Sequence, residues 1–164
     1  MALVSEWNNP RQALNCGFDM DFFLDWHGNG YSSLVRDYLL PKFGQELKDD
    51  NSYFKSTATR DISRFLEDYL PQYEDTKDKG LWCLITANHD CCRVAPVLDD
   101  LERRIAFAFL FTMPGAPFLY YGDEIGMVGS DDPDDRRAFE WGRGQQKLVE
   151  WYALLAQIRS QYSA

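Results

Sequence analysis

Short apolar runs separated by polar residues recur along this chain. The runs at 2–5, 81–85 and 117–121 have no polar alternation, a pattern typical of strands buried on both faces. We predict a further short strand at 17–20, with a helical turn or loop at 21–27. The pattern therefore predicts four short strands.

A second pattern places apolar residues at i, i+3, i+4 and i+7, which is typical of helices with one buried face. In the third such segment, residues 105–111 are apolar on every side, so we expect that helix to lie between two layers. Pro41 and Pro71 are expected to end the first two helices, because proline breaks a helix interior, and residues 72–80 should form an acidic turn. The helices are expected at 31–39, 62–70, 98–112 and 148–158.

Strands that alternate with helices indicate parallel βα units and an α/β fold. We find no internal repeat, low-complexity segment or linker, and we predict one domain over residues 1–164. That length is below the roughly 250 residues of a typical closed (β/α)₈ barrel. A complete barrel is therefore excluded for this chain.

The amino-acid composition limits the classes of molecule that this chain can bind. The chain has 26 acidic and 17 basic residues, a net charge of −9, and 45% hydrophobic residues. This balance argues against nucleic acid and against an anionic membrane surface, because both attract clustered Lys and Arg. There is no run of 18 apolar residues and no signal-peptide pattern, so we expect a cytoplasmic protein. The charge balance does not exclude neutral polar ligands.

The four cysteines form no Cys-x-x-Cys pair. We expect small buried or half-buried thiols in a reducing compartment, and no metal site. A metal-dependent α/β hydrolase remains an alternative, resting on His89, Asp90 and the cysteines.

Polar residues gather where the predicted strands end, the edge at which parallel α/β folds bind ligands. Two carboxyl groups on either side of a scissile bond, with aromatic faces for the sugar ring, would suit glycoside cleavage. Capping of helices is the alternative role for any one of these carboxylates. The residues concerned are Glu6 and Trp7, Asp19 and Asp21, Asn88 to Asp90 with Arg93, and the block 120–124.

Four blocks of the sequence resemble the α-amylase superfamily of glycoside hydrolases. Residues 106–127 (AFAFLFTMPGAPFLYYGDEIGM) are similar to its strand-eight region, and DPDDRRAFEW at 132–141 to the continuation in oligo-glucosidases and neopullulanase-like members. TANHDCCRV at 86–94 resembles the block after strand seven, and LVSEWNNP at 3–10 the strand-five block. The resemblance implies a partial (β/α)₈ TIM barrel, strands five to eight with their helices, without the inserted small domain or the C-terminal β-sandwich.

The resemblance also implies roles by position. Glu6 corresponds to the general acid/base, and Asp90 to the second essential carboxylate, which binds sugar hydroxyls and helps distort the ring. His89 corresponds to a sugar-hydroxyl ligand. Trp7 and Arg93 are further candidates for substrate binding, with a structural salt bridge as the alternative for Arg93. Asp123 and Glu124 of the Tyr-Tyr-Gly-Asp-Glu block are expected to be structural.

One part of the family pattern is missing. The family's nucleophilic aspartate lies on strand four, with a nearby arginine in a block resembling Gly-x-Arg-x-Asp, and no such block occurs here. The resemblance therefore implies part of a retaining hydrolase of α-glucans or oligosaccharides that is inactive as an isolated chain. It implies no cofactor in this chain and leaves calcium open for the complete enzyme.

A half barrel leaves two unpaired sheet edges, and we expect self-association through them. The alternative function is a non-catalytic carbohydrate- or partner-binding module on an amylase-like scaffold. A strand-four aspartate in the complete protein would favour the enzyme, and its absence would favour the binding module.

Overall fold

The computed structural model describes residues 1–6, 9–23, 32–35, 52–59, 61–130 and 132–162. Its four strands are parallel, and each pairs with the next strand along the chain. The predicted α/β class with parallel βα units is confirmed. The strands are β1 (Val4–Ser5), β2 (Met20–Phe23), β3 (Leu81–Ile85) and β4 (Ala116–Phe118).

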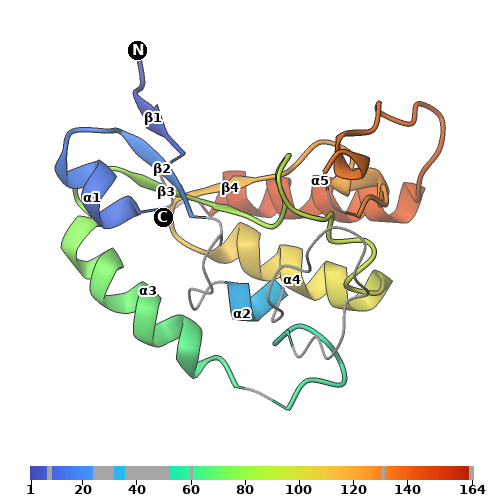
Figure 1. The fold of residues 1–164 in the computed structure, drawn as a ribbon, viewed down its shortest axis with the longest axis horizontal. Coiled ribbons are helices and arrows are strands. Elements are labelled where there is room, and N and C mark those ends of the chain that lie inside the picture. The colour runs from blue at the N-terminus through green and yellow to red at the C-terminus, as the bar shows by residue number, and fades with distance from the viewer. Residues whose placement is uncertain (7–8, 24–31, 36–51, 60, 131, 163–164) are drawn as a thin grey trace.

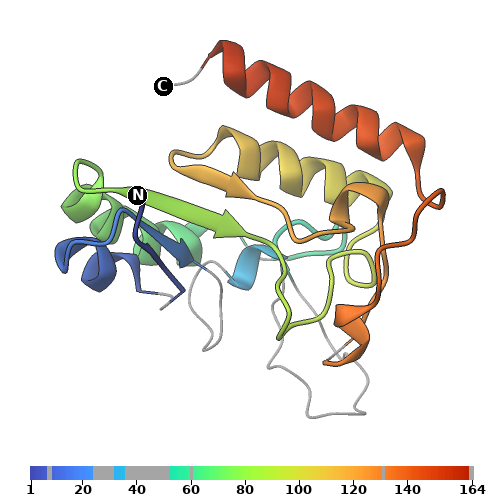
Figure 2. The same cartoon turned by 90° about the horizontal axis from the view of Figure 1, so that it is seen from above.

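The helices cover one side of this sheet. Figures 1 and 2 show α3 and α4 on the same side of the strands, with α5 packed beside α4. One-sided cover of a parallel sheet whose strands follow chain order is the arrangement of a barrel section. The helices are α1 (Pro10–Asn15), α2 (Ser32–Val35), α3 (Ser63–Thr76), α4 (Asp100–Thr112) and α5 (Gln146–Gln161), with 3₁₀ turns η1 (Asp123–Ile125) and η2 (Asp134–Arg136).

The two faces of the sheet have different neighbours. Phe23 and Leu84 are register partners and belong to the main hydrophobic core with the helices. Trp82 lies on the same face, and its Nε1 donates to Thr76 Oγ1 of α3 at 2.9 Å. On the other face, the rings of Phe22 and Phe118 meet edge to face with centroids 4.7 Å apart. This second face is the one that a closed barrel would enclose.

Helix α4 begins with a reciprocal cap. The Asp99 carboxylate accepts from the Glu102 N–H, and Glu102 Oε2 accepts from the Asp99 N–H, both at 2.9 Å. Phe107 and Leu110 are fully buried, whereas Ile105 is 51% exposed. The prediction of a helix enclosed on all sides is therefore wrong for the face that carries Ile105, because no described segment covers it.

The second strand lies later in the chain than predicted. It begins at Met20 and continues to Phe23, instead of occupying 17–20. The prediction was wrong because Asp21 was taken to end the apolar run. Asp21 is fully buried inside β2, where its Oδ2 accepts a hydrogen bond from the Asn9 N–H at 2.9 Å. A buried carboxylate with such a donor is tolerated within a strand.

Pro71 does not end α3, which continues to Thr76. The last turn is held by tertiary contacts: Tyr73 stacks on Tyr69 with centroids 5.3 Å apart, and Thr76 accepts from Trp82. These contacts offset the one helical hydrogen bond that proline cannot donate. Residues 72–76 are therefore helix rather than the predicted acidic turn.

The remaining predictions have mixed outcomes. The strand at 81–85 and the helices around 98–112 and 148–158 are confirmed. Of the predicted helix at 31–39, the described part is Ser32–Val35, and the rest lies outside the described residues. Helix α1 was missed, and the final strand ends at Phe118 instead of 121.

The cysteines are free thiols. Cys83, Cys91 and Cys92 are buried, and Cys16 is exposed. Burial raises the pKa of Cys83 to about 11, so this thiol stays protonated at neutral pH. Within the described part of the chain, the search for a helix long and apolar enough to cross a membrane finds none.

Candidate active site

A pocket of about 250 Å³ lies at the carboxyl ends of the strands, on the face away from the helices. Its walls combine apolar side chains from three strands with polar residues that follow strand ends. This is the edge at which the sequence predicted a site. The lining residues are Glu6, Phe22, Ile85, Asn88, His89, Phe118 and Tyr120.

Glu6 and His89 reach this pocket from different strands. Glu6 follows Ser5, the last residue of β1, and it is exposed to solvent. His89 lies in the loop after β3, and its side chain is about half exposed. Two predicted site residues, 83 positions apart in the sequence, are therefore brought to one pocket. Trp7, a third candidate, lies outside the described residues.

The Asp90 carboxylate is held at both oxygens. Oδ2 lies 3.1 Å from His89 Nε2, and Oδ1 lies 3.1 Å from an Arg136 guanidinium nitrogen, Nη2. The Asp90 N–H donates to Asn88 Oδ1 at 2.9 Å, which fixes the turn that presents the carboxylate. The side chain remains about one-third exposed, so a ligand can still reach it.

Asn88 belongs to the same loop and stabilises its conformation. Its backbone N–H donates to Cys91 Sγ at 3.4 Å, and its side chain is almost fully buried beside the pocket. The side-chain Nδ2 is buried and has no hydrogen-bond partner within the part of the chain that the structure describes. The amide thus offers an unused donor next to the predicted site.

Arg93 lies beneath the site and has no exposed surface. Its guanidinium carbon is 4.4 Å from the Tyr120 ring centroid and 4.5 Å from that of Tyr121. Its Nη1 lies 3.8 Å from Asp123 Oδ1, and its Nε donates to the Asp135 carbonyl at 3.0 Å. These contacts support the salt-bridge alternative for Arg93, because a fully buried guanidinium has no surface to offer a sugar.

The Tyr-Tyr-Gly-Asp-Glu block forms a buried support for the pocket. Burial is the main cause that raises the pKa of Tyr120, so its phenol stays neutral at the pocket wall. Asp123 is buried and accepts from Thr86 Oγ1 at 3.3 Å, while Glu124 accepts from the Gly122 N–H at 2.8 Å. The expected structural role of Asp123 and Glu124 agrees with these contacts.

Two carboxylates predicted at this edge lie elsewhere. Asp19 precedes β2, and its Oδ2 accepts from the Leu3 N–H at 2.7 Å. Asp21 is buried within the strand. Both were assigned to the rim because the strand was placed too early. Each accepts a hydrogen bond from a backbone N–H near the N-terminus, a contact that stabilises the local fold.

Sequence reasoning missed Arg136. It lies in η2, 46 residues after Asp90, and the stretch DPDDRR was expected to be a solvated loop or a helix cap. The similarity of this stretch to known enzymes was a signal, but the pairing with Asp90 depends on the tertiary fold.

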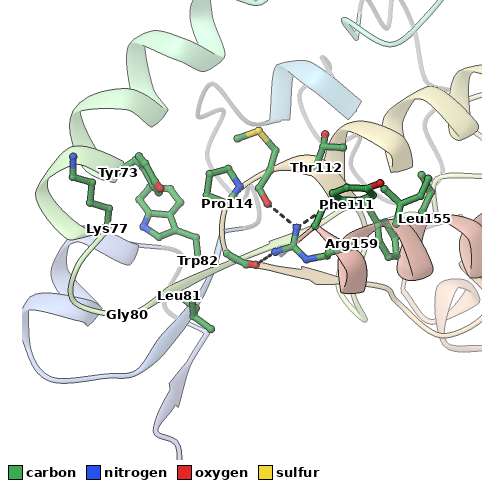
Figure 3. Close-up of a pocket in the computed structure, with 14 residues that line it drawn as sticks. Tyr73, Lys77, Gly80, Leu81, Trp82, Phe111, Thr112, Pro114, Leu155 and Arg159 are labelled. Carbon is green, nitrogen blue, oxygen red and sulfur yellow. Dashed lines mark hydrogen bonds between the residues drawn. The ribbon is translucent and has the colours of Figure 1, made fainter. Parts of the chain in front are cut away.

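A larger hollow, of about 430 Å³, lies at the opposite ends of the strands (Figure 3). Tyr73 and Trp82 form one part of its wall, and Phe111 and Leu155 another. Arg159 donates to the carbonyls of Phe111 and Met113 at 2.7 and 3.0 Å, and so closes the end of α4. The described residues around this hollow include no carboxylate, so it lacks the groups that acid catalysis requires.

Among the described residues, no group of three or more His, Cys, Asp or Glu side chains converges so as to hold a metal ion. The metal-dependent alternative therefore has no ligand set in this part of the chain.

Comparison with known proteins identifies the family. The family described as "Alpha amylase, catalytic domain" matches residues 35–157. A maltogenic alpha-amylase from Bacillus acidopullulyticus is 32% identical over 111 residues, which cover 65% of this chain and 19% of that protein. A cyclomaltodextrinase from Thermoanaerobacter pseudethanolicus is 34% identical over 109 residues, 64% of this chain and 19% of that protein.

Solved structures show the same fold. The cyclic α-maltosyl-(1→6)-maltose hydrolase from Arthrobacter globiformis superposes with a TM-score of 0.76 at 20% identity, covering 99% of this chain and 34% of that one. This chain thus spans about a fifth of the curated relatives and a third of the solved structure. It has the fold of part of an amylase TIM barrel, and by its sequence match over well more than half its length it belongs to the alpha-amylase family.

Proposed function

We propose that this chain is part of the catalytic barrel of a retaining glycoside hydrolase that cleaves α-glucosidic bonds in α-glucans or oligosaccharides. The observation that carries the proposal is the arrangement of Glu6, His89 and Asp90. They come from the ends of two parallel strands, and the first two line one pocket. Membership of the alpha-amylase family supports the reaction class.

The proposed mechanism assigns each polar group one task. Glu6, exposed at the pocket, donates a proton to the glycosidic oxygen and later removes one from water. Asp90 accepts hydrogen bonds from sugar hydroxyls and favours the oxocarbenium-like transition state. His89 donates to a neighbouring hydroxyl, while Phe118 and Tyr120 offer apolar faces to the ring. None of these tasks needs a cofactor bound to this chain.

A retaining reaction also needs a nucleophilic carboxylate about 5 Å from the acid, and this sequence has no block resembling the family's nucleophile. We therefore expect the isolated chain to show no measurable turnover. Incubation with 4-nitrophenyl α-glucoside and with maltooligosaccharides tests this expectation. Turnover that Glu6→Gln abolishes would show that the isolated chain is an enzyme and would sink the inactivity proposal.

The catalytic role of Glu6 is tested in the complete protein that contains this chain. Glu6→Gln removes the transferable proton and should lower kcat by about 10³-fold on maltooligosaccharides. Glu67→Gln, on the exposed side of α3, is the matched control and should leave kcat unchanged. Equal rates for the Glu6→Gln variant and the wild type would refute the assignment.

We further propose that isolated chains associate through the outer edges of β1 and β4. Each of these strands pairs on one side only within the described chain, and Leu3, Val4 and Phe118 are each 42–49% exposed. Unpaired edges with apolar side chains favour pairing with another chain. Light scattering should give a mass above 19.1 kDa, and a monodisperse monomer would contradict the proposal.

A further inference from the structure

The orientation of Asp90 depends on a residue outside its own loop. His89, which holds one carboxylate oxygen at 3.1 Å, is its direct neighbour in the sequence. The other oxygen is held by Arg136, which belongs to the turn η2 after β4. The carboxylate is thus fixed from two directions, and only one of them is local.

Arg136 holds the loop as well as the carboxylate. Its Nε donates to the His89 carbonyl at 2.8 Å, and its Nη2 donates to Asp90 Oδ1 at 3.1 Å. The two donors, Nε and Nη2, lie on one edge of the planar guanidinium, so the pair of bonds allows little rotation about the arginine side chain. Arg136 is itself held by Asp132, whose Oδ1 lies 2.9 Å from Nε.

We propose that Arg136 is a positioning residue for Asp90. It orients the carboxylate toward the pocket and fixes the backbone of His89, so that both groups meet a sugar in one arrangement. This inference rests on the proposed function, because it concerns the same site. The guanidinium acts through Asp90 and needs no contact with the substrate to do so.

The neighbouring residue Arg137 provides a matched control. The two side chains are equally exposed, at 44% and 45%. Arg137 pairs with Asp134, to which its Nε donates at 2.7 Å, and its side-chain contacts within the described residues do not include Asp90 or His89. Replacing either arginine removes one positive charge and one pairing with a nearby aspartate, Asp132 or Asp134, whereas the contact with the 89–90 loop is lost only with Arg136.

The functional experiment is a double-mutant cycle on maltotriose binding, measured by isothermal titration calorimetry. Arg136→Ala should weaken binding about tenfold, Arg136→Lys should restore part of the loss, and Arg137→Ala should change it less than about twofold. In the Asp90→Asn background, Arg136→Ala should change binding less than about twofold, because its effect passes through Asp90. If Arg136→Ala weakened maltotriose binding equally in the wild-type and Asp90→Asn proteins, the proposal would be overturned. Such a result would mean that Arg136 acts independently of Asp90.

A second measurement needs no sugar. In ¹H–¹⁵N spectra of the isolated chain, Arg136→Ala should move the amide signals of His89 and Asp90 more than Arg137→Ala does. Unchanged signals would overturn the positioning role. If the complete protein that contains this chain binds no maltotriose while these signals move as expected, the proposed function fails and the positioning role stands.

Discussion

Two arginine–aspartate clusters lie close together in this molecule, and they differ in burial. Arg93 is fully buried between two tyrosine rings, with Asp123 and Asp135 nearby. Arg136 is 44% exposed and pairs with the solvent-accessible Asp90 and Asp132. The two clusters use the same kinds of charged group, in the same region between β3 and the turns after β4.

Because the two clusters differ in burial, removal of the arginine has a different effect in each. A buried cation compensates carboxylates that water cannot reach, so its removal leaves uncompensated charge in the interior. An exposed cation pairs with carboxylates that water can solvate, so its removal costs little stability and mainly frees the partner to move. The comparison teaches that the buried cluster supports the fold, whereas the exposed cluster sets the geometry of the site.

The largest expected effect is on the buried cluster. Arg93→Ala should lower the free energy of unfolding by about 3–5 kcal/mol, because Asp123 and Asp135 lose their compensating charge. Urea denaturation followed by circular dichroism measures the change. A loss as small as that of an exposed arginine would remove the distinction between the clusters.

A gain of stability is expected from Asp135→Asn. Both carboxylate oxygens of Asp135 are buried, neither has a hydrogen bond to another described residue, and burial is the main cause that raises its pKa above 3.8. The folded state therefore holds the proton more tightly, and stability falls as pH rises above 3.8. At pH 7 the variant should be more stable by about 1 kcal/mol, or about 3 °C in Tm, and the gain should vanish near pH 3. Calorimetry between pH 3 and pH 7 measures this gain. A gain that is larger near pH 3 than at pH 7 would contradict the prediction.

The smallest effect on stability is expected from Arg136→Ala. An exposed pair contributes less than about 1 kcal/mol, and salt screens it. The loss of unfolding free energy in the variant relative to the wild type, measured by urea denaturation, should stay below this value and should be smaller in high NaCl than in low NaCl. A loss approaching that of Arg93→Ala would mean that the exposed cluster also supports the fold.

The sequence predicted those parts of the fold that depend on local pattern. The apolar run at 81–85 and the periodic segment ending near Ile158 became β3 and α5. Helix α1 was missed although its signals were present, since Asn9 caps it and Pro10 occupies its first position. Pro71 was misjudged because the packing that retains the last turn of α3 involves Trp82, which no local pattern reveals.

Prediction of the candidate active site from the sequence has the same limit, because tertiary contacts leave no local pattern. Glu6, His89 and Asp90 could be placed near one edge because parallel strands end together. Arg93 could not be assigned, because its burial depends on tyrosines from the next βα unit. Arg136 could not be predicted for a similar reason, because its partner Asp90 lies 46 residues earlier in the sequence.

The pairing of β2, β3 and β4 each with the preceding described strand has a consequence for folding during synthesis. When β2 leaves the ribosome, its partner β1 is already available, and the same holds for β3 and then β4. These four described strands can thus be assembled in the direction of translation, each on the strand that precedes it. Such stepwise growth keeps loop-closure entropy low and shortens the time during which a strand edge is free to aggregate.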